Sequence, residues 1–533
     1  DSEGRILTKS AWGKTLYETS YGADGKPSGI VAQGVRTDYT YDAAGRLKKL
    51  VSDNGLSVQY RYDRNGMQTQ MLYGNGLVTA YTYDSRSRLT GMRSGFPDRT
   101  PLFDASYTYD ASGNRTGRQE TVHGNHGTHK TPVTTAYGYD SMNRLVSENR
   151  GDSRISYKYD LSGNRISRAT DGRTENYLYN SRNQLTQLTG DDKNISYTYD
   201  PAGNLTEEHS TEHKKIYFYD TYNRNTEITG NDFTQKNHYD AEGYRYSIEE
   251  NDKVTNFVYR CGIMLAELDE AGNQAKTYTL GNEYAGHVSE LNNSLTSENK
   301  AASYYITDEQ GSIRYMLDQS GEVQNYYQYS AFGETIISEE TTPNRLRYNA
   351  QTEDELTGLY YLRARYYAPD IGRFTQEDVI YNDGLNLYAY CNSNPVMYSD
   401  PSGFAKETCK SKVGGECGSE SGTSSTTAGF DDWLGKGATD NKVYFGMKDG
   451  TAQYTGITKQ TKNARLNQHN NAGKGFDDLD IQYEGLTRNQ ARAIEQYYIE
   501  NGPNALNKIN SISPNNKYYQ DAMNWAKQYL GVE

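Results

Sequence analysis

Tyrosines alternate with polar residues in short runs, and each run ends in a turn signal. In Tyr81-Thr82-Tyr83 the period of two places both rings on one face of a β-strand. Asp84 follows this run, and after other runs a glycine comes three residues beyond the Asp, as Gly113 follows Asp110. An Asp side chain can bond the backbone two residues on, and Gly accepts a positive φ. Each run with its turn therefore predicts one β-hairpin.

The unit repeats along the chain at intervals of 20 to 30 residues. Tyr-Asp, or Tyr-Asn at residue 179, begins at residues 41, 62, 83, 109, 139, 159, 179, 199, 219 and 239. A fixed period of this kind indicates a repeat architecture, and stacked hairpins predict one long, coiling antiparallel sheet. The predicted fold class is mostly β, with a small α/β domain at the C-terminal end.

Composition narrows the possible classes of protein. Hydrophobic residues make up 34% of the 533 residues, below the roughly 45–50% of a typical globular chain, although tyrosine alone contributes 51. No run approaches the ~18 apolar residues of a membrane-spanning helix. The net charge of -13 argues against nucleic-acid binding by the chain as a whole. Four sparse cysteines predict free thiols. The chain opens with Asp1-Ser2, which suggests a piece of a longer precursor whose N-terminal delivery module is missing.

The repeats resemble those of the Rhs/YD-repeat family. The resemblance implies that residues 1–342 form a YD-repeat shell, in which the sheet spirals into a hollow cocoon. A hollow shell would also account for the low aliphatic content. The alternative from the residues themselves is a solid β-solenoid or an adhesin stalk.

Residues 343–404 resemble the Rhs-associated core. The matching segments are Gly358–Tyr367, Pro369–Phe374, Gly384–Tyr390 and Asp400–Phe404. In that family the core plugs the cocoon and cleaves the chain by a pair of carboxylates. Carried over by position, the resemblance implies Asp378 and Asp400 as that pair, Arg365 beside them, and Phe404–Ala405 as the scissile bond.

Two carboxylates in one site split their pKa values, so that one can act as base and the other as acid. This sequence departs from the family pattern where Val379 follows Asp378 in place of the usual proline. The alternative is that Asp370, Asp378 and Asp400 only form turns.

The composition changes after Phe404. Residues 405–440 include a Ser/Thr/Gly-rich stretch that predicts a flexible linker, and no Tyr-Asp unit follows it. Within residues 441–533, the runs 442–446 and 452–457 predict a hairpin around Asp449-Gly450. Residues 487–499 predict a helix with Thr487 as its N-cap.

The order of residues in this tail resembles the GIY-YIG nuclease superfamily. The resemblance rests on Tyr444 and Tyr454 ten residues apart, then Gly456, Arg465 and His469, and a helical Glu495, although Lys442-Val443 replaces the usual Gly-Ile. It implies a metal-dependent endonuclease in which Glu495 holds one divalent ion, Mg²⁺ or a similar cation. The catalytic residues would be Tyr444, Tyr454, Arg465, His469 and Glu495. The basic residues expected to follow the substrate backbone are Lys459, Lys462, Arg488 and Arg492.

Simpler structural roles remain open for these residues. Tyr444 and Tyr454 can be ordinary sheet aromatics, and Glu495 can form a helical surface pair with Arg492. His123, His126 and His129 lie in the longest repeat interval and are interpreted as part of a loop.

Together these patterns predict a secreted or delivered bacterial effector. Its shell would enclose its own C-terminal nuclease toxin, which acts on nucleic acid in the target-cell cytoplasm and is held in check by a cognate immunity protein. The sequence does not separate DNA from RNA as substrate. The rival hypothesis is a cell-surface adhesion or recognition protein with a non-catalytic C-terminal cap.

Overall fold

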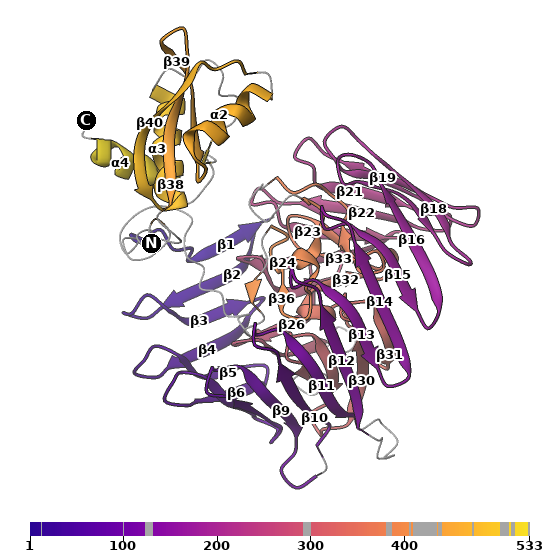
Figure 1. Cartoon of the computed structure of the whole chain (residues 1–533). Helices are drawn as coiled ribbons and strands as arrows, with labels where there is room; N and C mark the ends of the chain where they lie inside the picture. Colours follow the sequence, from indigo (N-terminus) through magenta and orange to yellow (C-terminus); the bar gives the residue numbers. More distant parts are fainter. Residues whose placement is uncertain are drawn as a thin grey trace. The chain divides into compact units, whose positions relative to one another are not determined.

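The chain divides into two compact units, seen in a computed structural model (Figure 1). One unit comprises Asp1 and Ile6–Cys417, and the other comprises Ser2–Arg5 and Gly418–Glu533. The structure describes residues 1–11, 13–99, 101–122, 132–290, 300–379, 386–404, 407–408, 434, 440–471, 474–501, 511–512 and 518–530. The three-histidine loop, Ala405 and most of the predicted linker lie outside these residues.

The first unit is built on one antiparallel sheet of 31 strands, in which each strand pairs with the next along the chain. Its first half consists of β1 (Thr8–Ala11), β2 (Lys14–Tyr21), β3 (Pro27–Ala32), β4 (Val35–Tyr41), β5 (Leu47–Ser52), β6 (Ser57–Tyr62), β7 (Gln68–Tyr73), β8 (Val78–Tyr83), β9 (Leu89–Gly95), β10 (Phe103–Tyr109), β11 (Arg115–Val122), β12 (Val133–Tyr139), β13 (Leu145–Arg150), β14 (Ser153–Tyr159), β15 (Arg165–Thr170) and β16 (Arg173–Tyr179). Its second half consists of β17 (Leu185–Thr189), β18 (Asn194–Tyr199), β19 (Leu205–His209), β20 (Lys214–Tyr219), β21 (Asn225–Thr229), β22 (Thr234–Tyr239), β23 (Arg245–Glu250), β24 (Lys253–Arg260), β25 (Ile263–Leu268), β26 (Gln274–Leu280), β27 (Tyr284–Glu290), β28 (Lys300–Thr307), β29 (Ile313–Leu317), β30 (Val323–Tyr329) and β31 (Thr335–Glu340). The predicted long antiparallel sheet is confirmed.

Each repeat is one hairpin whose turn is held by its Asp. The Asp160 Oδ1 atom accepts hydrogen bonds from the backbone N–H groups of Ser162 (2.9 Å) and Asn164 (2.8 Å), and Gly163 has φ +85°. In eight repeats the second tyrosine then joins neighbouring hairpins, because its hydroxyl donates to a carbonyl of the preceding one. Tyr83 donates to the Gln68 carbonyl at 2.7 Å in this way. Buried phenols thus find partners for their hydroxyls.

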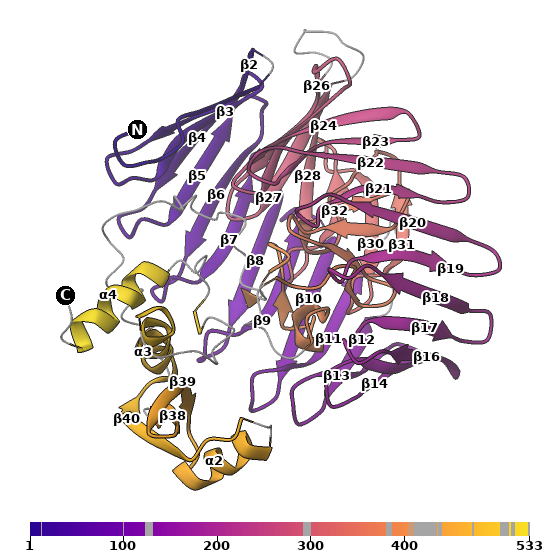
Figure 2. The same cartoon turned by 90° about the horizontal axis from the view of Figure 1, so that it is seen from above.

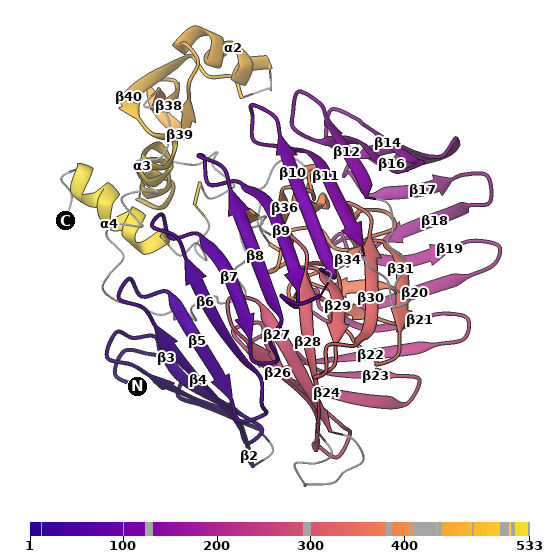
Figure 3. The ribbon, with the colours of Figure 1, turned by 90° about the horizontal axis from the view of Figure 1, so that it is seen from below.

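The sheet curls so that distant strands pack face to face. Leu50, Met71 and Met92 on β5, β7 and β9 pack in one cluster with Val288 on β27 and Tyr304 on β28. Figures 2 and 3 show residues 343–404, drawn in orange, between the purple and pink parts of the sheet. This arrangement buries the core segment in the interior of the first unit.

The core segment adds its own short elements. They are the 3-10 helices η2 (Tyr348–Ala350) and η3 (Tyr390–Ser393), and the strands β32 (Thr352–Asp354), β33 (Leu359–Tyr361), β34 (Tyr366–Ala368), β35 (Arg373–Phe374), β36 (Tyr398–Ser399) and β37 (Glu407–Thr408). A fully buried pair fixes the small sheet to the shell. Arg245 of β23 binds both carboxylate oxygens of Asp354 and also donates to the Tyr366 hydroxyl at 2.8 Å.

The second unit has a three-stranded antiparallel sheet in the order β39-β38-β40. Its elements are β38 (Asn441–Lys448), β39 (Thr451–Thr458), β40 (Asp478–Leu486), α2 (Lys462–Asn471), α3 (Arg488–Asn501) and α4 (Tyr519–Leu530). Thr487 caps α3: its hydroxyl accepts the Gln490 N–H at 3.2 Å, and the Gln490 side chain accepts the Thr487 N–H at 2.9 Å. This reciprocal capping satisfies two backbone donors at the start of the helix.

Two further expectations concern cysteines and membranes. Cys261 is disulfide-bonded, so the prediction of free thiols is wrong for this residue. Among the helices that the structure describes, none is long and apolar enough to cross a membrane.

Candidate functional site

Tyr444 is the centre of a hydrogen-bonded cluster in the second unit. Its side chain is buried on β38, and its hydroxyl lies 2.6 Å from Nε2 of His469 and 3.1 Å from Nε of Arg465. Arg465 and His469 are one helical turn apart on α2, so both side chains reach the same phenol. The arginine N–H donates to the phenol oxygen, which leaves the hydroxyl proton directed at the imidazole.

Tyr454 of β39 joins the same cluster through its ring. The ring centroid lies 5.4 Å from that of His469 and 6.3 Å from that of Tyr444. Gly456 leaves the space for this arrangement, since a Cβ there would lie 2.4 Å from the Tyr444 hydroxyl and 2.7 Å from a Tyr454 ring carbon. The ammonium of Lys474 sits 3.5 Å from the Tyr454 ring centroid, a cation–π contact.

Glu495 is the buried carboxylate of this region and projects from α3. It accepts the Ser511 hydroxyl, and Arg492 holds the Ser511 carbonyl through Nε at 2.8 Å and Nη2 at 2.6 Å. Burial raises the pKa of Glu495, while Ser511 and the charges of Arg492 and Arg465 act in the opposite direction. The interpretation of Glu495 as an exposed surface pair with Arg492 does not fit this burial.

Burial also sets the protonation of the cluster. It lowers the pKa of His469 to about 4, and the charges of Lys474 and Arg465 add to the effect. It raises the pKa of the Tyr444 hydroxyl above its ordinary value, although Arg465 opposes the shift. At neutral pH the cluster therefore pairs a neutral phenol with a neutral imidazole.

The four basic residues expected to bind substrate are spread over the unit. Lys459 pairs with Asp440 at 3.0 Å and Lys462 with Asp478 at 2.8 Å, both at the surface. Arg488 is exposed at the start of α3, and Arg492 is partly buried against Ser511. Among the described residues, no hydrogen bond or ion pair joins Lys459 or Lys462 to the tyrosine cluster.

The donor set around Glu495 limits which metal could bind. Within the described part of the chain, no group of three or more His, Cys, Asp and Glu side chains is placed to hold an ion. Magnesium is commonly held by one or two carboxylates together with substrate phosphates and water. A single carboxylate among cations fits Mg²⁺ in this manner, with the phosphate supplying the remaining negative charge.

In the first unit, Arg365 brings the two core carboxylates together. Its Nη2 lies 2.8 Å from Asp378 and 3.9 Å from Asp400, and all three side chains are buried. The same guanidinium donates through Nε to the Gly403 carbonyl, next to the expected scissile bond. It also stacks 3.6 Å from the ring centroid of Phe374.

Asp400 also shapes the turn that precedes the expected cleavage point. Its Oδ1 accepts the Gly403 N–H at 2.8 Å and the Ser402 N–H and hydroxyl at 3.2 and 3.1 Å. The Ser402 oxygen in turn accepts the Phe404 N–H at 3.2 Å. Strands β36 and β37 pair on either side, so Phe404 lies in a hairpin loop. The turn-forming role of Asp400 is therefore present together with the carboxylate pair.

The core is fixed to the shell at three particular turns. In these turns an asparagine, rather than a glycine, occupies the positive-φ position: Asn143 (φ 60°), Asn183 (φ 61°) and Asn223 (φ 60°). The carbonyl of each accepts a hydrogen bond from a core side chain, donated respectively by Asn394, Arg373 and Gln376. Gln376 is two residues before Asp378, so this contact helps to place a carboxylate.

Several residues of these sites were missed by the sequence reasoning, Ser511 beside Glu495 among them. Lys474 and Phe476 enter the tyrosine cluster from the segment after α2, and Ser402 links Asp400 to the Phe404 amide. The only sequence signal was their position, since Ser402 lies inside the Asp-Pro-Ser-Gly turn and Lys474 lies between two glycines.

Comparison with known families identifies the repeats. The family model described as teneurin YD-shell matches residues 96–396, and the RHS repeat model matches residues 41–78. A Bacillus subtilis (strain 168) protein named tRNA nuclease WapA is 38% identical over 175 residues, which cover 31% of this chain and 7% of that protein. A Burkholderia cenocepacia (strain H111) protein named double-stranded DNA deaminase toxin A is 38% identical over 108 residues, 19% of this chain and 8% of that protein. The chain spans less than a tenth of the length of either relative.

Solved structures show the same fold. A chain in the Photorhabdus luminescens Tc holotoxin pore, carrying a TccC3 mutation, matches 73% of this chain with a TM-score of 0.58 and 22% identity. The match covers 21% of that chain. At this level of identity the likeness concerns the fold alone.

Proposed function

Because the chain belongs to the teneurin YD-shell family, we propose that it is part of an Rhs-type toxin whose shell carries a C-terminal GIY-YIG-type endonuclease. The proposal joins two parts of one chain. The relatives named as nuclease and deaminase toxins support a toxin that acts on nucleic acid. The repeats account for the container, and the second unit accounts for the activity.

The observation that carries the nuclease proposal is the Tyr444 hydroxyl held between His469 and Arg465. An ordinary sheet tyrosine needs one partner for its hydroxyl, whereas this one has a proton acceptor and a cationic donor. Glu495 lies close enough for its charge to raise the pKa of Tyr454. A phenol, an imidazole, a guanidinium and a buried carboxylate in one region match the needs of phosphodiester hydrolysis.

The proposed mechanism assigns each group one task. Water attacks the phosphorus, and Tyr444 takes a proton from the water while its own proton passes to the neutral His469. The bond between phosphorus and the leaving sugar oxygen breaks, and that oxygen takes up a proton from the solvent. Arg465 neutralises the charge that develops on the phosphate oxygens, for which its planar fork is suited. Tyr454 and Lys474 border the site and orient the scissile group. Mg²⁺ held by Glu495 would supply Lewis-acid stabilisation of the phosphate charge.

Release of the nuclease is proposed to occur by cleavage between Phe404 and Ala405. One of Asp378 and Asp400 would take a proton from water as it attacks the Phe404 carbonyl carbon, and the other would give a proton to the departing amide nitrogen. Arg365 holds both carboxylates beside the Gly403 carbonyl. The products are a carboxylate at Phe404 and an amine at Ala405.

The biological setting follows from these proposals. The shell encloses the tail until delivery, the freed nuclease cleaves DNA or RNA in the target-cell cytoplasm, and a cognate immunity protein protects the producing cell.

The nuclease proposal is tested with the full chain. Purified protein is incubated with plasmid DNA and with total RNA, in Mg²⁺ and in chelator. We expect Mg²⁺-dependent cleavage of one substrate that falls at least 100-fold in Glu495→Gln. The control Glu484→Gln changes an exposed carboxylate of the same unit and keeps activity. Equal cleavage by the wild type and Glu495→Gln, or none by either, would refute the proposal.

A further inference from the structure

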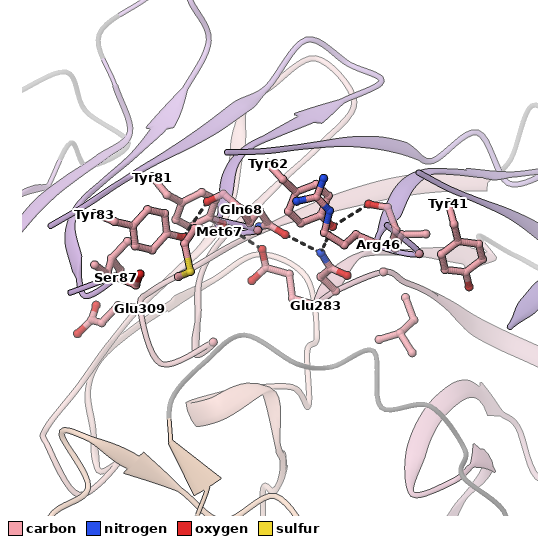
Figure 4. A pocket seen from close by; sticks show the side chains of 18 of the residues that line it. Tyr41, Arg46, Tyr62, Met67, Gln68, Tyr81, Tyr83, Ser87, Glu283 and Glu309 are labelled. Carbon is pink, nitrogen blue, oxygen red and sulfur yellow. Dashed lines mark hydrogen bonds between the residues drawn. The ribbon is translucent and has the colours of Figure 1, made fainter. Parts of the chain in front are cut away.

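A cavity of about 910 Å³ lies inside the first unit, away from the core carboxylates. One wall carries the second tyrosines of four successive repeats, Tyr41, Tyr62, Tyr83 and Tyr109. Figure 4 shows Tyr41, Tyr62 and Tyr83 along this wall, with the Glu283 side chain beside the row. Aromatic faces and a buried carboxylate that meet in one cavity are suited to binding a ligand.

Three of these four rings are covered by a cation from the chain itself. Lys26 lies over Tyr41 with its nitrogen 5.3 Å from the ring centroid. The guanidinium carbons of Arg46 and Arg88 lie 4.6 Å from the Tyr62 centroid and 4.8 Å from the Tyr109 centroid.

Tyr83 departs from this pattern. The two arginines each follow the Asp of their turn by four residues, and the residue at that position before Tyr83 is Met67. Along this wall a cation–π contact thus recurs at Tyr41, Tyr62 and Tyr109. At Tyr83 the thioether of Met67 takes the place of the cation.

The Glu283 carboxylate lies near Tyr83, the ring of this wall that no cation of the described residues covers. It is 4% exposed and accepts hydrogen bonds from Thr307 (2.6 Å) and Tyr81 (3.2 Å). Among the described residues, Glu283 forms no ion pair, whereas Glu309 of the same cavity pairs with Arg115 at 2.8 Å. Burial raises the pKa of Glu283, and the neighbouring Asp308 raises it further. A cationic ligand would replace this unfavourable burial by an ion pair.

Three of the six cationic residues that line the cavity form ion pairs with carboxylates: Arg46, Arg88 and Arg115. Arg46 and Arg88 bind Asp42 and Asp84 of their own turns, at 2.6 and 2.7 Å. Arg260 differs, since its buried Nη2 has no hydrogen-bond partner among the residues that the structure describes. It can donate to an oxygen of the ligand, such as an amide carbonyl.

We propose that this cavity binds an organic cation, an ammonium or guanidinium group, against the Glu283 carboxylate and over the Tyr83 ring. The flexible Met67 side chain can move aside to admit it. Free polyamines and basic peptide side chains share this chemistry. The site is independent of the nuclease and of chain cleavage.

The test is isothermal titration calorimetry on the purified full chain with two probes. Spermidine represents a free polyamine, and N-acetyl-arginine amide represents a peptide side chain. We expect one binding site for at least one probe, and the better probe identifies the source. Glu283→Gln should weaken binding at least tenfold, because it removes the countercharge.

Met67→Arg provides a second, independent variant. It installs the cation found in the sister turns, so we expect a folded shell that no longer binds the probe. Glu339→Gln, an exposed carboxylate on β31, is the control and should bind as the wild type does. The proposal is overturned if neither probe binds the wild type, or if Met67→Arg, folded by its unfolding temperature, binds as tightly as the wild type.

Discussion

At the scale of single residues, the position of the Tyr444 hydroxyl depends on the space beside Gly456 as much as on its hydrogen-bond partners His469 and Arg465. The missing side chain of Gly456 lets the Tyr444 hydroxyl and the Tyr454 ring approach the same point. Because the φ of Gly456 is not positive, its role is to leave room for side chains rather than to adopt an unusual backbone conformation. This explains why a glycine follows the second tyrosine of the candidate motif.

Gly456→Ala is expected to displace the phenols from His469 and Arg465. The added Cβ would lie 2.4 Å from the Tyr444 oxygen, and overpacking of this kind costs about 1–3 kcal/mol. We predict a loss of nuclease activity much greater than the loss of folded protein, measured by substrate cleavage and circular dichroism. Thr451→Ala, an exposed position on the same strand, serves as control. Unchanged activity in Gly456→Ala would show that the phenol position does not matter.

His469 predicts a pH dependence of stability with a defined sign. Its pKa falls from the ordinary value of about 6.5 to about 4 on folding, so the folded state favours the neutral imidazole. The resulting stability is complete above pH 6.5 and is lost as the pH falls toward 4. Thermal unfolding at pH 7.5 and 5.0 should show a larger decrease for the wild type than for His469→Gln. Equal decreases would contradict the assignment.

The sequence could indicate the tyrosines, Arg465, His469 and Glu495 because their order matches a known motif. It could not indicate Lys474 or Ser511, since their contacts with Tyr454 and Glu495 arise only after distant segments pack together. Similarly, the pairing of Asp378 and Asp400 through Arg365 required the folded core. The sequence therefore indicates which residue types are present, whereas it does not indicate which distant residues come into contact in the folded chain.

At the scale of elements, the residue four positions after the turn Asp is an arginine in some hairpins and an asparagine in others. Arg46, Arg88, Arg144 and Arg224 bind the Asp of their own turns. Asn114, Asn164 and Asn204 also bond the Asp of their own turns, and each bonds in addition the side chain of an asparagine in the next repeat's turn. Core side chains Asn394 and Asn386 bond to Asn114 and Asn164. The asparagine turns thus offer side-chain oxygens to the core, in addition to the carbonyls that Asn143, Asn183 and Asn223 offer.

Asn164→Arg should preserve the hairpin but disturb the core. The arginine fits sister turns, whereas it removes the acceptor that Asn386 uses at 2.7 Å. A lost buried hydrogen bond costs about 1–3 kcal/mol, so we predict a lower unfolding temperature and slower cleavage of the chain. The matched control Arg46→Asn alters a turn that the core does not contact through any described hydrogen bond. Equal effects of the two substitutions would contradict this division of hairpins.

The hairpins themselves were predictable because Tyr-x-Tyr-Asp combines a strand period with a local turn signal. The sequence shows which turns contain an arginine and which an asparagine, but it does not show which of these turns contact the core. The contacts come from core residues such as Asn386 and Asn394, which lie 222 and 280 positions from Asn164 and Asn114 along the chain and meet these turns only in the folded shell.

At the scale of the whole molecule, one chain combines a container with a separate compact unit. The net charge of -13 belongs to residues 1–404, because residues 405–533 contain 15 basic and 15 acidic side chains. Residues 1–404 also contain 43 of the 51 tyrosines. A tail with its own composition and its own cluster of candidate catalytic groups is consistent with a unit that acts after release.

The central claim is that this chain frees its own C-terminal unit, and intact-mass spectrometry under denaturing conditions tests it most directly. We predict that the purified wild type gives two species, one ending at Phe404 and one beginning at Ala405. Asp378→Asn and Asp400→Asn should each give one species of full mass, while Asp370→Asn, outside the carboxylate pair, should be cut. A wild-type chain that remains at full mass, or an Asp400→Asn chain cut at the same bond, would contradict the account.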